Sequence, residues 1–598
     1  MLLKRLWLYI SLRRRRQFGL LLVLMMLSSL AEIFSIGAVL PFLAVLSAPE
    51  RVFELPKIQP IIQIFGLHEP AQLLLPLTLA FGAAAFIAGV MRLLLLWAST
   101  RLSFATGADL GISIYERTLY QPYSVHCARN SSEVISGISG KANGIIYGII
   151  FPVLMLISAS VMLIAILVAL LLLEPVIALS AFGGFGLIYI VIILLTRNIL
   201  TADSQCVARE SVQVIKCLQE GLGGIRDVLI DGSQATYCQI YRSADSPLRR
   251  AQGNAVFISS SPRYGMEALG MLLIAALAYT LAQQSEGIGK AIPILGALAL
   301  GAQRLLPVLQ QAYSSWTSVL SGQAGLQDTL ELLDQPLPAH INQSGGQRLP
   351  FTQNIYLRNL GFRYSQQTPE VLRKINLSIA KGSCVGFIGA TGSGKSTLLD
   401  IVMGLLQPTE GVLEVDGQII TPECTGAWQA HIAHVPQAIF LADTTIEENI
   451  AFGVPKDFID QERVRIAARQ AQIAESIENL PNKYQTLVGE RGVRLSGGQR
   501  QRIGIARALY KQADVIIFDE ATSALDNETE QAVMHAIEGL SQDLTILIIA
   551  HRLTTLENCG QIVELEGGHI KRIGSFHDVV SQSSAAAKKR KDKLTYDT

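Results

Sequence analysis

Long apolar runs fill residues 17–320, and shorter alternating runs replace them in the rest of the chain. A helix needs about 20 apolar residues to cross the hydrocarbon core of a bilayer. By that measure the sequence predicts six membrane spans, at residues 18–46, 72–98, 146–173, 176–198, 255–283 and 291–318. Residues 1–333 are therefore expected to form an all-α polytopic transmembrane domain.

Two connections between these spans, about residues 99–145 and 199–254, are longer than turns and carry helical patterning with mixed charge. They are expected to extend the membrane helices into the cytosol. Basic residues gather in these connections, whereas the opposite loops carry few, so the positive-inside rule places both termini in the cytoplasm. All seven cysteines then face the reducing side. They occur singly, and their spacing predicts neither a metal site nor a disulfide framework.

The composition changes after Leu333. Residues 334–352 are rich in Pro, Gly and Gln, which indicates a linker. From residue 353 to 583, β-type runs such as CVGFIG and VIIFDE alternate with helical stretches, as in an α/β domain built on a mostly parallel sheet. Residues 584–598 form a basic tail. The 49 basic residues balance 48 acidic ones, so net charge gives no reason to expect a nucleic-acid partner.

A glycine-rich motif, GATGSGKST, follows the predicted strand CVGFI and precedes the helical stretch TLLDIVMGLL. Its glycines let several backbone N–H groups face one phosphate chain at the start of a helix. Lys395 is expected to reach the β- and γ-phosphates of ATP, Ser396 to ligate Mg²⁺, and Thr397 to lie near the α-phosphate. The predicted ATP-binding residues of this loop are Gly389, Thr391, Gly392, Ser393, Gly394, Lys395, Ser396 and Thr397.

The run VIIFDE, residues 515–520, predicts a buried strand that ends in two carboxylates. One carboxylate can hold Mg²⁺ while the next polarises the attacking water. We therefore assign Asp519 to the metal and Glu520 to the general base. Taken alone, the same residues could be an ordinary strand end and turn.

The motif LSGGQRQR, residues 495–502, makes the sequence resemble the ATP-binding cassette (ABC) proteins over nearly the whole chain. Six spans followed by a cassette are similar to the exporter class that includes the lipid A flippase and multidrug half-transporters. The resemblance implies a P-loop NTPase fold, ATP and Mg²⁺ as cofactors, and a homodimer in which each signature motif completes the ATP site of the partner. A heterodimer with a related half stays open. The signature residues in question are Ser496, Gly497, Gly498 and Gln499.

The resemblance assigns roles to four further residues, in the family order. Tyr364 resembles the aromatic residue that stacks on adenine, and Gln437 the residue that contacts Mg²⁺ and the attacking water. Asp526 resembles the cross-dimer loop aspartate, and His551 the γ-phosphate sensor. The same architecture places coupling helices within roughly residues 120–131 and near residues 207–217.

The membrane half carries shorter resemblances. The segments YQPYSVHCARNSSEVI, SPRYGMEALG and AQRLLPVLQQAY are similar to parts of bacterial flippases of lipid-linked oligosaccharides and of envelope-polysaccharide exporters. Counting about 1.5 Å per residue along the spans places Arg92 and Arg263 at the cytosolic headgroup level, and Arg304 within the inner leaflet. Guanidinium groups suit bidentate binding of phosphate. The candidate substrate-binding residues are therefore Arg92, Arg263 and Arg304, together with Glu267 beside Arg263. Alternatively, Arg92 and Arg263 snorkel, and Arg263 pairs with Glu267 at i,i+4.

The resemblance therefore implies an ATP-hydrolysing exporter or flippase of the bacterial inner membrane. Its expected cargo is a lipid-linked oligosaccharide or similar anionic glycolipid, moved from the cytosolic to the outer leaflet by alternating access. An exporter of hydrophobic drugs or phospholipids is one alternative, and the three arginines argue against it. An ATP-gated channel or regulatory ABC protein is another, and it would tolerate loss of Glu520, which is intact.

Overall fold

The computed structural model describes residues 1–47, 50, 53, 69–173, 175–282, 288–337, 349–521, 527–538, 544–550 and 552–579. The chain divides into two compact units. The first comprises Met1–Gln121 and Arg129–Leu337, and the second comprises Pro122–Ala128 and Pro338–Thr598. The boundary between Leu337 and Pro338 falls within the linker predicted at residues 334–352. The basic tail predicted at residues 584–598 lies outside the described residues.

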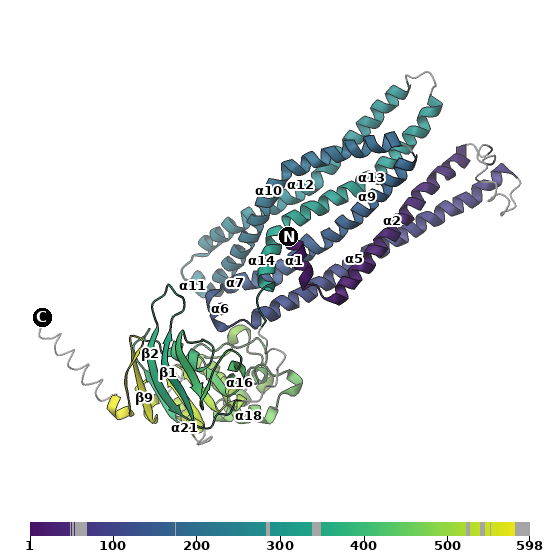
Figure 1. Cartoon of the computed structure of the whole chain (residues 1–598). Helices are drawn as coiled ribbons and strands as arrows, with labels where there is room; N and C mark the ends of the chain where they lie inside the picture. The colour runs from purple at the N-terminus through teal and green to yellow at the C-terminus, as the bar shows by residue number, and fades with distance from the viewer. Residues whose placement is uncertain are drawn as a thin grey trace. The chain divides into compact units, whose positions relative to one another are not determined.

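The first unit is all-helical, as the apolar runs predict (Figure 1). Its helices are α1 (Leu2–Tyr9), α2 (Leu12–Ser47), η1 (Pro70–Leu73), α5 (Leu74–Leu119), α7 (Ser131–Ile135), η2 (Ser136–Lys141), α8 (Ala142–Ile145), η3 (Ile146–Ile150), α9 (Phe151–Leu173), α10 (Pro175–Gly223), α11 (Ile225–Ile230), α12 (Gln234–Ala282), α13 (Ile288–Ser321) and α14 (Gln323–Leu333). The segments η2 and η3 are π-helical and lead into α9.

Four helical segments within the described part of the chain are long and apolar enough to cross a membrane. They are Leu12–Ser35, Leu74–Leu119, Ser131–Val168 and Gly183–Gly223, and each overlaps one of the first four predicted spans. The fifth and sixth predicted spans lie on α12 and α13. Many side chains of these two spans are outside the described set, so their membrane crossing stays a prediction.

The connections expected to extend the membrane helices are helical. Helices α5, α10 and α12 each run over more than 40 residues, well beyond the roughly 20 that a bilayer needs. The short helix α6 (Tyr123–Ala128) falls within the first predicted coupling segment. The second prediction was wrong, because residues 207–217 lie inside the continuous helix α10. The chain turns later, around α11, where Gly224 and Gly232 interrupt the helical run.

The helices of the first unit pack in neighbouring pairs, with α2 along α5 and α10 along α12 (Figure 1). Small residues allow the closest approaches. A Cβ added to Gly107 on α5 would meet the side chain of Ile146 at 2.2 Å, and one on Gly322 would lie 3.1 Å from the carbonyl oxygen of Gly148. One apolar core includes Phe18, Leu95, Ile114, Ile149 and Leu330. A second core gathers residues of α9, α10, α12 and α13.

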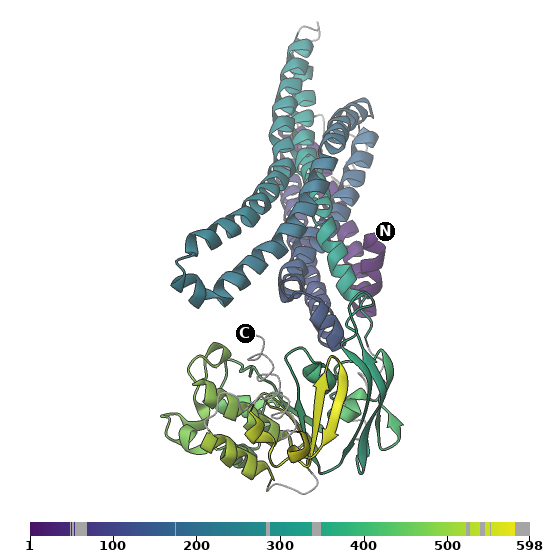
Figure 2. The same ribbon diagram turned by 90° about the vertical axis from the view of Figure 1, so that its left-hand side faces the viewer.

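The second unit contains two sheets (Figure 2). The first has the order β2-β1-β4-β5, formed by β1 (Asn354–Phe362), β2 (Leu372–Ala380), β4 (Glu410–Val415) and β5 (Gln418–Ile419). The second has the order β10-β9-β3-β8-β7-β6, formed by β3 (Cys384–Ile388), β6 (Ile432–Val435), β7 (Val515–Asp519), β8 (Thr545–Ile549), β9 (Gln561–Glu566) and β10 (His569–Gly574). All pairings in the second sheet are parallel except that of β9 with β10.

Apart from α6, the remaining elements of this unit connect or follow the strands. They are α15 (Lys395–Val402), α16 (Thr425–Gln429), α17 (Ile446–Ile450), η5 (Lys456–Phe458), α18 (Gln461–Gln470), α19 (Ala474–Glu478), η6 (Lys483–Gln485), η7 (Glu490–Gly492), α20 (Gly497–Lys511), α21 (Asn527–Glu538) and η8 (Leu553–Leu556). All five residues of β8 and the first four of β7 are buried, which explains their continuous apolar sequences. The fold is therefore the expected α/β one. The loops that leave β3, β6, β7 and β8 meet at the carboxyl edge of the sheet, where such folds bind ligands.

Candidate functional site

The loop between β3 and α15 is shaped by glycines that no larger residue could replace. Gly392 and Gly394 have φ angles of +81° and +97°. A Cβ on Gly394 would lie 2.7 Å from the side chain of Leu372, and one on Gly389 would lie 2.2 Å from the carbonyl oxygen of Leu565. Gly394 is also the N-cap of α15, so no side chain covers the N–H groups of the first helical turn. Those groups are left for a ligand, as the motif predicts.

Two side chains of this loop fit a phosphate ligand. The hydroxyl of Ser393 is buried and has no hydrogen-bond partner among the residues that the structure describes, and an unsatisfied buried hydroxyl is costly unless a ligand completes it. The Nζ of Lys395 donates to the carbonyl oxygens of Gly389 and Ala390 at 2.9 and 3.1 Å, so its charge lies over the loop. The loop thus supplies a cation, a hydroxyl and backbone donors around one small space.

The predicted metal ligands come together across two elements. The hydroxyl of Ser396, on α15, lies close enough to the carboxylate of Asp519, at the end of β7, to influence its pKa. Burial raises the pKa of Asp519, and the neighbouring Glu520 adds to this, while the Ser396 hydroxyl and the Lys395 charge act in the opposite direction. A hydroxyl, a carboxylate and an amide oxygen are hard oxygen donors of the type Mg²⁺ accepts. The residues present therefore fit the ion.

Glu520 is held beside Gln437 at the same edge. The amide Nε2 of Gln437 donates to Oε2 of Glu520 at 2.6 Å, although 83 residues separate them in sequence. The backbone of Glu520 has a φ of +53°, which is uncommon for a residue other than glycine. Its N–H donates to the carbonyl oxygen of Ile549 on β8. The backbone strain is thus compensated by the sheet, and it aims the carboxylate at Gln437.

Tyr364 lies at the mouth of the same loop. Its ring is 54% exposed, so a face is open to stack on a base. Its hydroxyl lies 3.1 Å from Oγ1 of the buried Thr397, and Phe362 supports the ring edge to face at 4.9 Å. The predicted adenine and α-phosphate residues are therefore neighbours.

The signature motif begins α20 with a capping box. Ser496 Oγ accepts from the N–H of Gln499, and the Gln499 side chain accepts from the N–H of Ser496. Ser496 and Gly497 are exposed. Within the described part of the chain, no hydrogen bond joins these residues to the phosphate loop. That leaves them accessible to a second subunit, and their role there stays a prediction.

Two predicted site residues, Asp526 and His551, lie outside the described residues. Their neighbours show a contact that the sequence did not reveal. Glu530 on α21 is only 4% exposed and accepts from Arg552 Nη1 at 3.3 Å and from Thr555 Oγ1 at 2.6 Å. It joins the helix that follows Asp526 to the segment that follows His551. No motif marks this glutamate, because its partners lie more than 20 residues away.

The membrane arginines have partners on neighbouring turns or helices. Arg92 forms an ion pair with Glu32 of α2, a buried residue for which the sequence predicted no role. Arg263 Nε and Glu267 Oε1 lie 2.8 Å apart, which confirms the i,i+4 pair. These side chains are 62% and 41% exposed. The side chain of Arg304 lies outside the described set.

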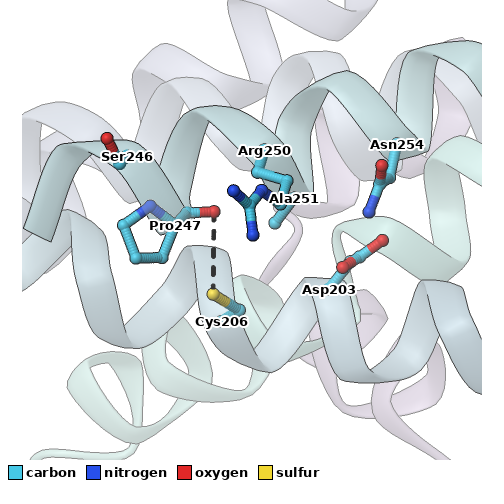
Figure 3. Close-up of a pocket in the computed structure, with 7 residues that line it drawn as sticks. All are labelled: Asp203, Cys206, Ser246, Pro247, Arg250, Ala251 and Asn254. Carbon is cyan, nitrogen blue, oxygen red and sulfur yellow. Dashed lines mark hydrogen bonds between the residues drawn. The ribbon is translucent and has the colours of Figure 1, made fainter.

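A pocket of about 220 Å³ lies between α10 and α12 (Figure 3). The Sγ of Cys206 contacts the carbonyl oxygen of Pro247 at 3.9 Å, and the side chains of Asp203 and Asn254 face each other across the space. The Oδ2 of Asp203 is buried, and the described part of the chain offers it no hydrogen-bond partner. Sequence patterning gave no signal for this pocket, because it depends on the register of two long helices.

Comparison with known proteins matches both units of the chain. The protein-family model described as ABC transporter matches residues 372–523. The family model described as ABC transporter transmembrane region matches residues 18–292. An ATP-dependent lipid A-core flippase of Cupriavidus metallidurans is 28% identical over 525 residues, covering 87% of this chain and 86% of that protein. A Staphylococcus aureus (strain COL) protein, provisionally named as a multidrug export ATP-binding/permease protein, is 40% identical over 245 residues, covering 41% and 42%. A solved structure of a bacterial Atm1-family ABC exporter with ATP bound has a TM-score of 0.78 at 25% identity, covering 97% of this chain and 98% of that one.

Proposed function

Because the chain belongs to the ABC transporters, as an exporter half-transporter whose transmembrane domain is fused to an ABC ATPase domain, we propose that it flips an anionic glycolipid of the lipid-linked oligosaccharide class. The direction is from the cytosolic to the outer leaflet of the bacterial inner membrane, with the ATPase domain in the cytoplasm. Two copies of the chain form the transporter, and the Ser496 segment of each copy faces the phosphate loop of the other.

The observation that supports an ATP-driven pump is the convergence of a glycine loop and five functional side chains at one sheet edge. Lys395 and the glycine loop would hold the phosphates of ATP, and Ser396 with Asp519 would hold Mg²⁺. The ion supplies charge neutralisation at the phosphates when bound. Glu520 accepts the proton of the attacking water, and Gln437, at 2.6 Å, holds that carboxylate in place. Closing and reopening the two cassettes would switch the access of the membrane cavity.

The observation that supports a phosphate-bearing lipid is the geometry of Arg263. Its contact with Glu267 uses Nε, and the side chain is 62% exposed. A guanidinium carries five N–H donors, so the Arg263 side chain can pair with Glu267 and still have donors for a phosphate. The Cupriavidus relative is named as a lipid A-core flippase, which supports a lipid as cargo.

The test is ATP turnover in nanodiscs of the purified full chain with and without a polyprenyl-pyrophosphate oligosaccharide. We expect this lipid to stimulate turnover several-fold, and Arg263→Gln and Arg304→Ala to lose most of that stimulation. Arg249→Gln is the matched control, because Arg249 pairs with Asp245 on the same helix at i,i+4 and is 64% exposed. It should respond as the wild type does.

Lipid A-core and hydrophobic drugs serve as competing cargoes in the same assay. Stimulation by lipid A-core alone would replace the oligosaccharide class with that lipid. Stimulation by drugs alone, unchanged by Arg263→Gln, would instead favour the multidrug export named for the Staphylococcus relative. Absence of both binding and stimulation by the polyprenyl lipid would refute the glycolipid proposal.

A further inference from the structure

Two cysteines of the second unit meet although 175 residues separate them in sequence. The Sγ atoms of Cys384 and Cys559 lie 2.7 Å apart, and neither is in a disulfide. The S–S bond of a disulfide is about 2.04 Å long, so bond formation requires an approach of only about 0.7 Å. Cys559 is 5% exposed, and Cys384 is partly exposed.

The sheet itself brings these thiols together. Cys384 is the first residue of β3, and Cys559 lies two residues before β9. The two strands are parallel neighbours in a register that pairs Val385 with Gln561. Gly386 lets the strands approach, because a Cβ there would lie 2.7 Å from Ile562 and 2.8 Å from Leu556. The contact is therefore fixed by the core of the cassette and does not depend on a mobile loop.

We propose that Cys384 and Cys559 form an oxidation site whose disulfide slows ATP turnover. The more exposed Cys384 attacks a peroxide as the thiolate, the O–O bond breaks, and a sulfenic acid forms on Cys384. The sulfur of Cys559 then attacks that sulfur, the S–O bond breaks, and water leaves. In total, two thiols and one hydrogen peroxide give one disulfide and two water molecules. A small thiol reductant reverses the reaction by exchange.

The position of the disulfide explains its effect on turnover. Strand β3 ends at the phosphate loop, and Cys559 ends the segment that begins at His551, the expected γ-phosphate sensor. Glu530 already holds two residues of that segment, Arg552 and Thr555. A covalent bond between the start of β3 and the end of this segment restricts both loops. Because the sensor must engage and release the phosphate in every cycle, that restriction slows the cycle.

Tryptic mass spectrometry of the full-length protein tests the bond directly. The detergent-solubilised protein is treated with hydrogen peroxide and digested without reductant. Cys384 and Cys559 fall in the tryptic peptides Gly382–Lys395 and Leu553–Lys571. We expect a cross-linked peptide pair two hydrogens lighter than the sum of its parts, on chains that run as monomers in a non-reducing gel. It should be absent from Cys384→Ser and Cys559→Ser. It should persist in the control Cys424→Ser, whose sulfur contacts Thr421 instead.

ATP turnover of the same samples tests the consequence. Oxidation should lower the turnover of the wild type and of Cys424→Ser at least about three-fold, and dithiothreitol should restore it. Cys384→Ser and Cys559→Ser should keep their turnover under peroxide. The disulfide should also raise the apparent unfolding temperature of the cassette by about 5 °C, because it closes a long loop.

Three results would overturn the proposal. One is over-oxidation of Cys384 to a sulfinic acid without a cross-linked peptide, since the thiols then never meet. Another is a complete cross-link with unchanged turnover. The third is a peroxide-dependent loss of turnover that persists in Cys384→Ser. Because each serine variant is compared with its own untreated sample, reduced stability of a variant does not mimic any of them.

Discussion

The ion pair between Glu32 on α2 and Arg92 on α5 gives a direct test of what holds the first two long helices together. The Glu32 side chain is 3% exposed, whereas that of Arg92 is 50% exposed. We consider Glu32→Gln, Arg92→Gln and the double variant. Each single change leaves one charge without its opposite charge on the neighbouring helix.

The exposure of the two partners determines how much stability each substitution is expected to cost. Breaking a fully buried pair costs about 3–5 kcal/mol, and exposed pairs are worth at most about 1 kcal/mol. Since one partner is buried and the other is half exposed, we expect each single substitution to lower the free energy of unfolding by about 2 kcal/mol. For a domain of this size, that corresponds to about 4–8 °C in the apparent unfolding temperature.

Thermal unfolding in detergent, at one scan rate for all variants, measures this cost. The double variant should unfold near the single variants, because removing the second charge leaves no additional unpaired group. Glu220→Gln is the control, since Glu220 forms an exposed i,i+4 pair with Lys216 at 3.8 Å. It should shift the midpoint by less than about 2 °C. A double variant destabilised by the sum of the singles would refute the coupling, and Arg92 would return as a candidate for substrate.

Three residues of the cassette carry further predictions. Glu520→Gln should lower ATP turnover at least about 100-fold while a fluorescent ATP analogue still binds in titration; turnover within about ten-fold of wild type would remove the general-base role. Glu530→Gln should slow turnover about 10-fold without weakening that binding, whereas Glu528→Gln, an exposed neighbour on α21, should change neither. Burial lowers the pKa of His434 below its usual 6.5, so the unfolded chain binds a proton that the folded cassette does not, and stability is lost as the pH falls below about 6.5. In thermal melts from pH 7.5 to 5.5, His434→Leu should flatten this loss and the exposed His569→Leu should not; equal slopes would refute the assignment.

The phosphate site could be predicted because its chemistry is local in sequence. A glycine loop between a strand and a helix forms the same N–H cradle wherever it occurs, and the positive φ angles of Gly392 and Gly394 confirm why glycine is needed there. The proximity of Ser396 and Asp519 also follows from the parallel sheet. Ser396 lies at the start of the helix after β3, and Asp519 ends β7, so both lie at the carboxyl edge, with β8 between the two strands. Even the pairing of Gln437 with Glu520 reflects the adjacency of β6 and β7.

The contacts that escaped prediction depend on packing between distant segments. Glu32 lies within the first apolar run of the sequence, and its pairing with Arg92 follows only from the register of α2 against α5. Glu530 belongs to no motif, and its partners Arg552 and Thr555 lie in the segment that follows β8. Spacing also gave no hint of the contact between the thiols of Cys384 and Cys559, because parallel strands bring together residues that many elements separate. A sequence shows which groups need partners, but the partners themselves are set by tertiary packing.

The contact between Glu32 and Arg92 also bears on the depth predicted for Arg92. Counting residues along the second span put it at the cytosolic headgroup level. On the side assigned to the cytosol, however, α5 continues with the exposed apolar residues Leu93 and Trp97, and α2 presents the exposed Leu27. Such side chains belong among lipid tails, so we infer that the pair lies within the hydrocarbon core. A charge there requires a partner, and Glu32 supplies it.

This depth separates Arg92 from the arginines proposed to meet the substrate. A lipid phosphate would have to displace a buried carboxylate from Arg92, whereas the exposed fork of Arg263 has donors left beside Glu267. Arg263→Gln should therefore lose most of the lipid-stimulated ATP turnover. Arg92→Lys, which preserves the charge opposite Glu32, should lose much less. Equal losses in the nanodisc assay would place both arginines in the substrate path and contradict the structural role of the pair.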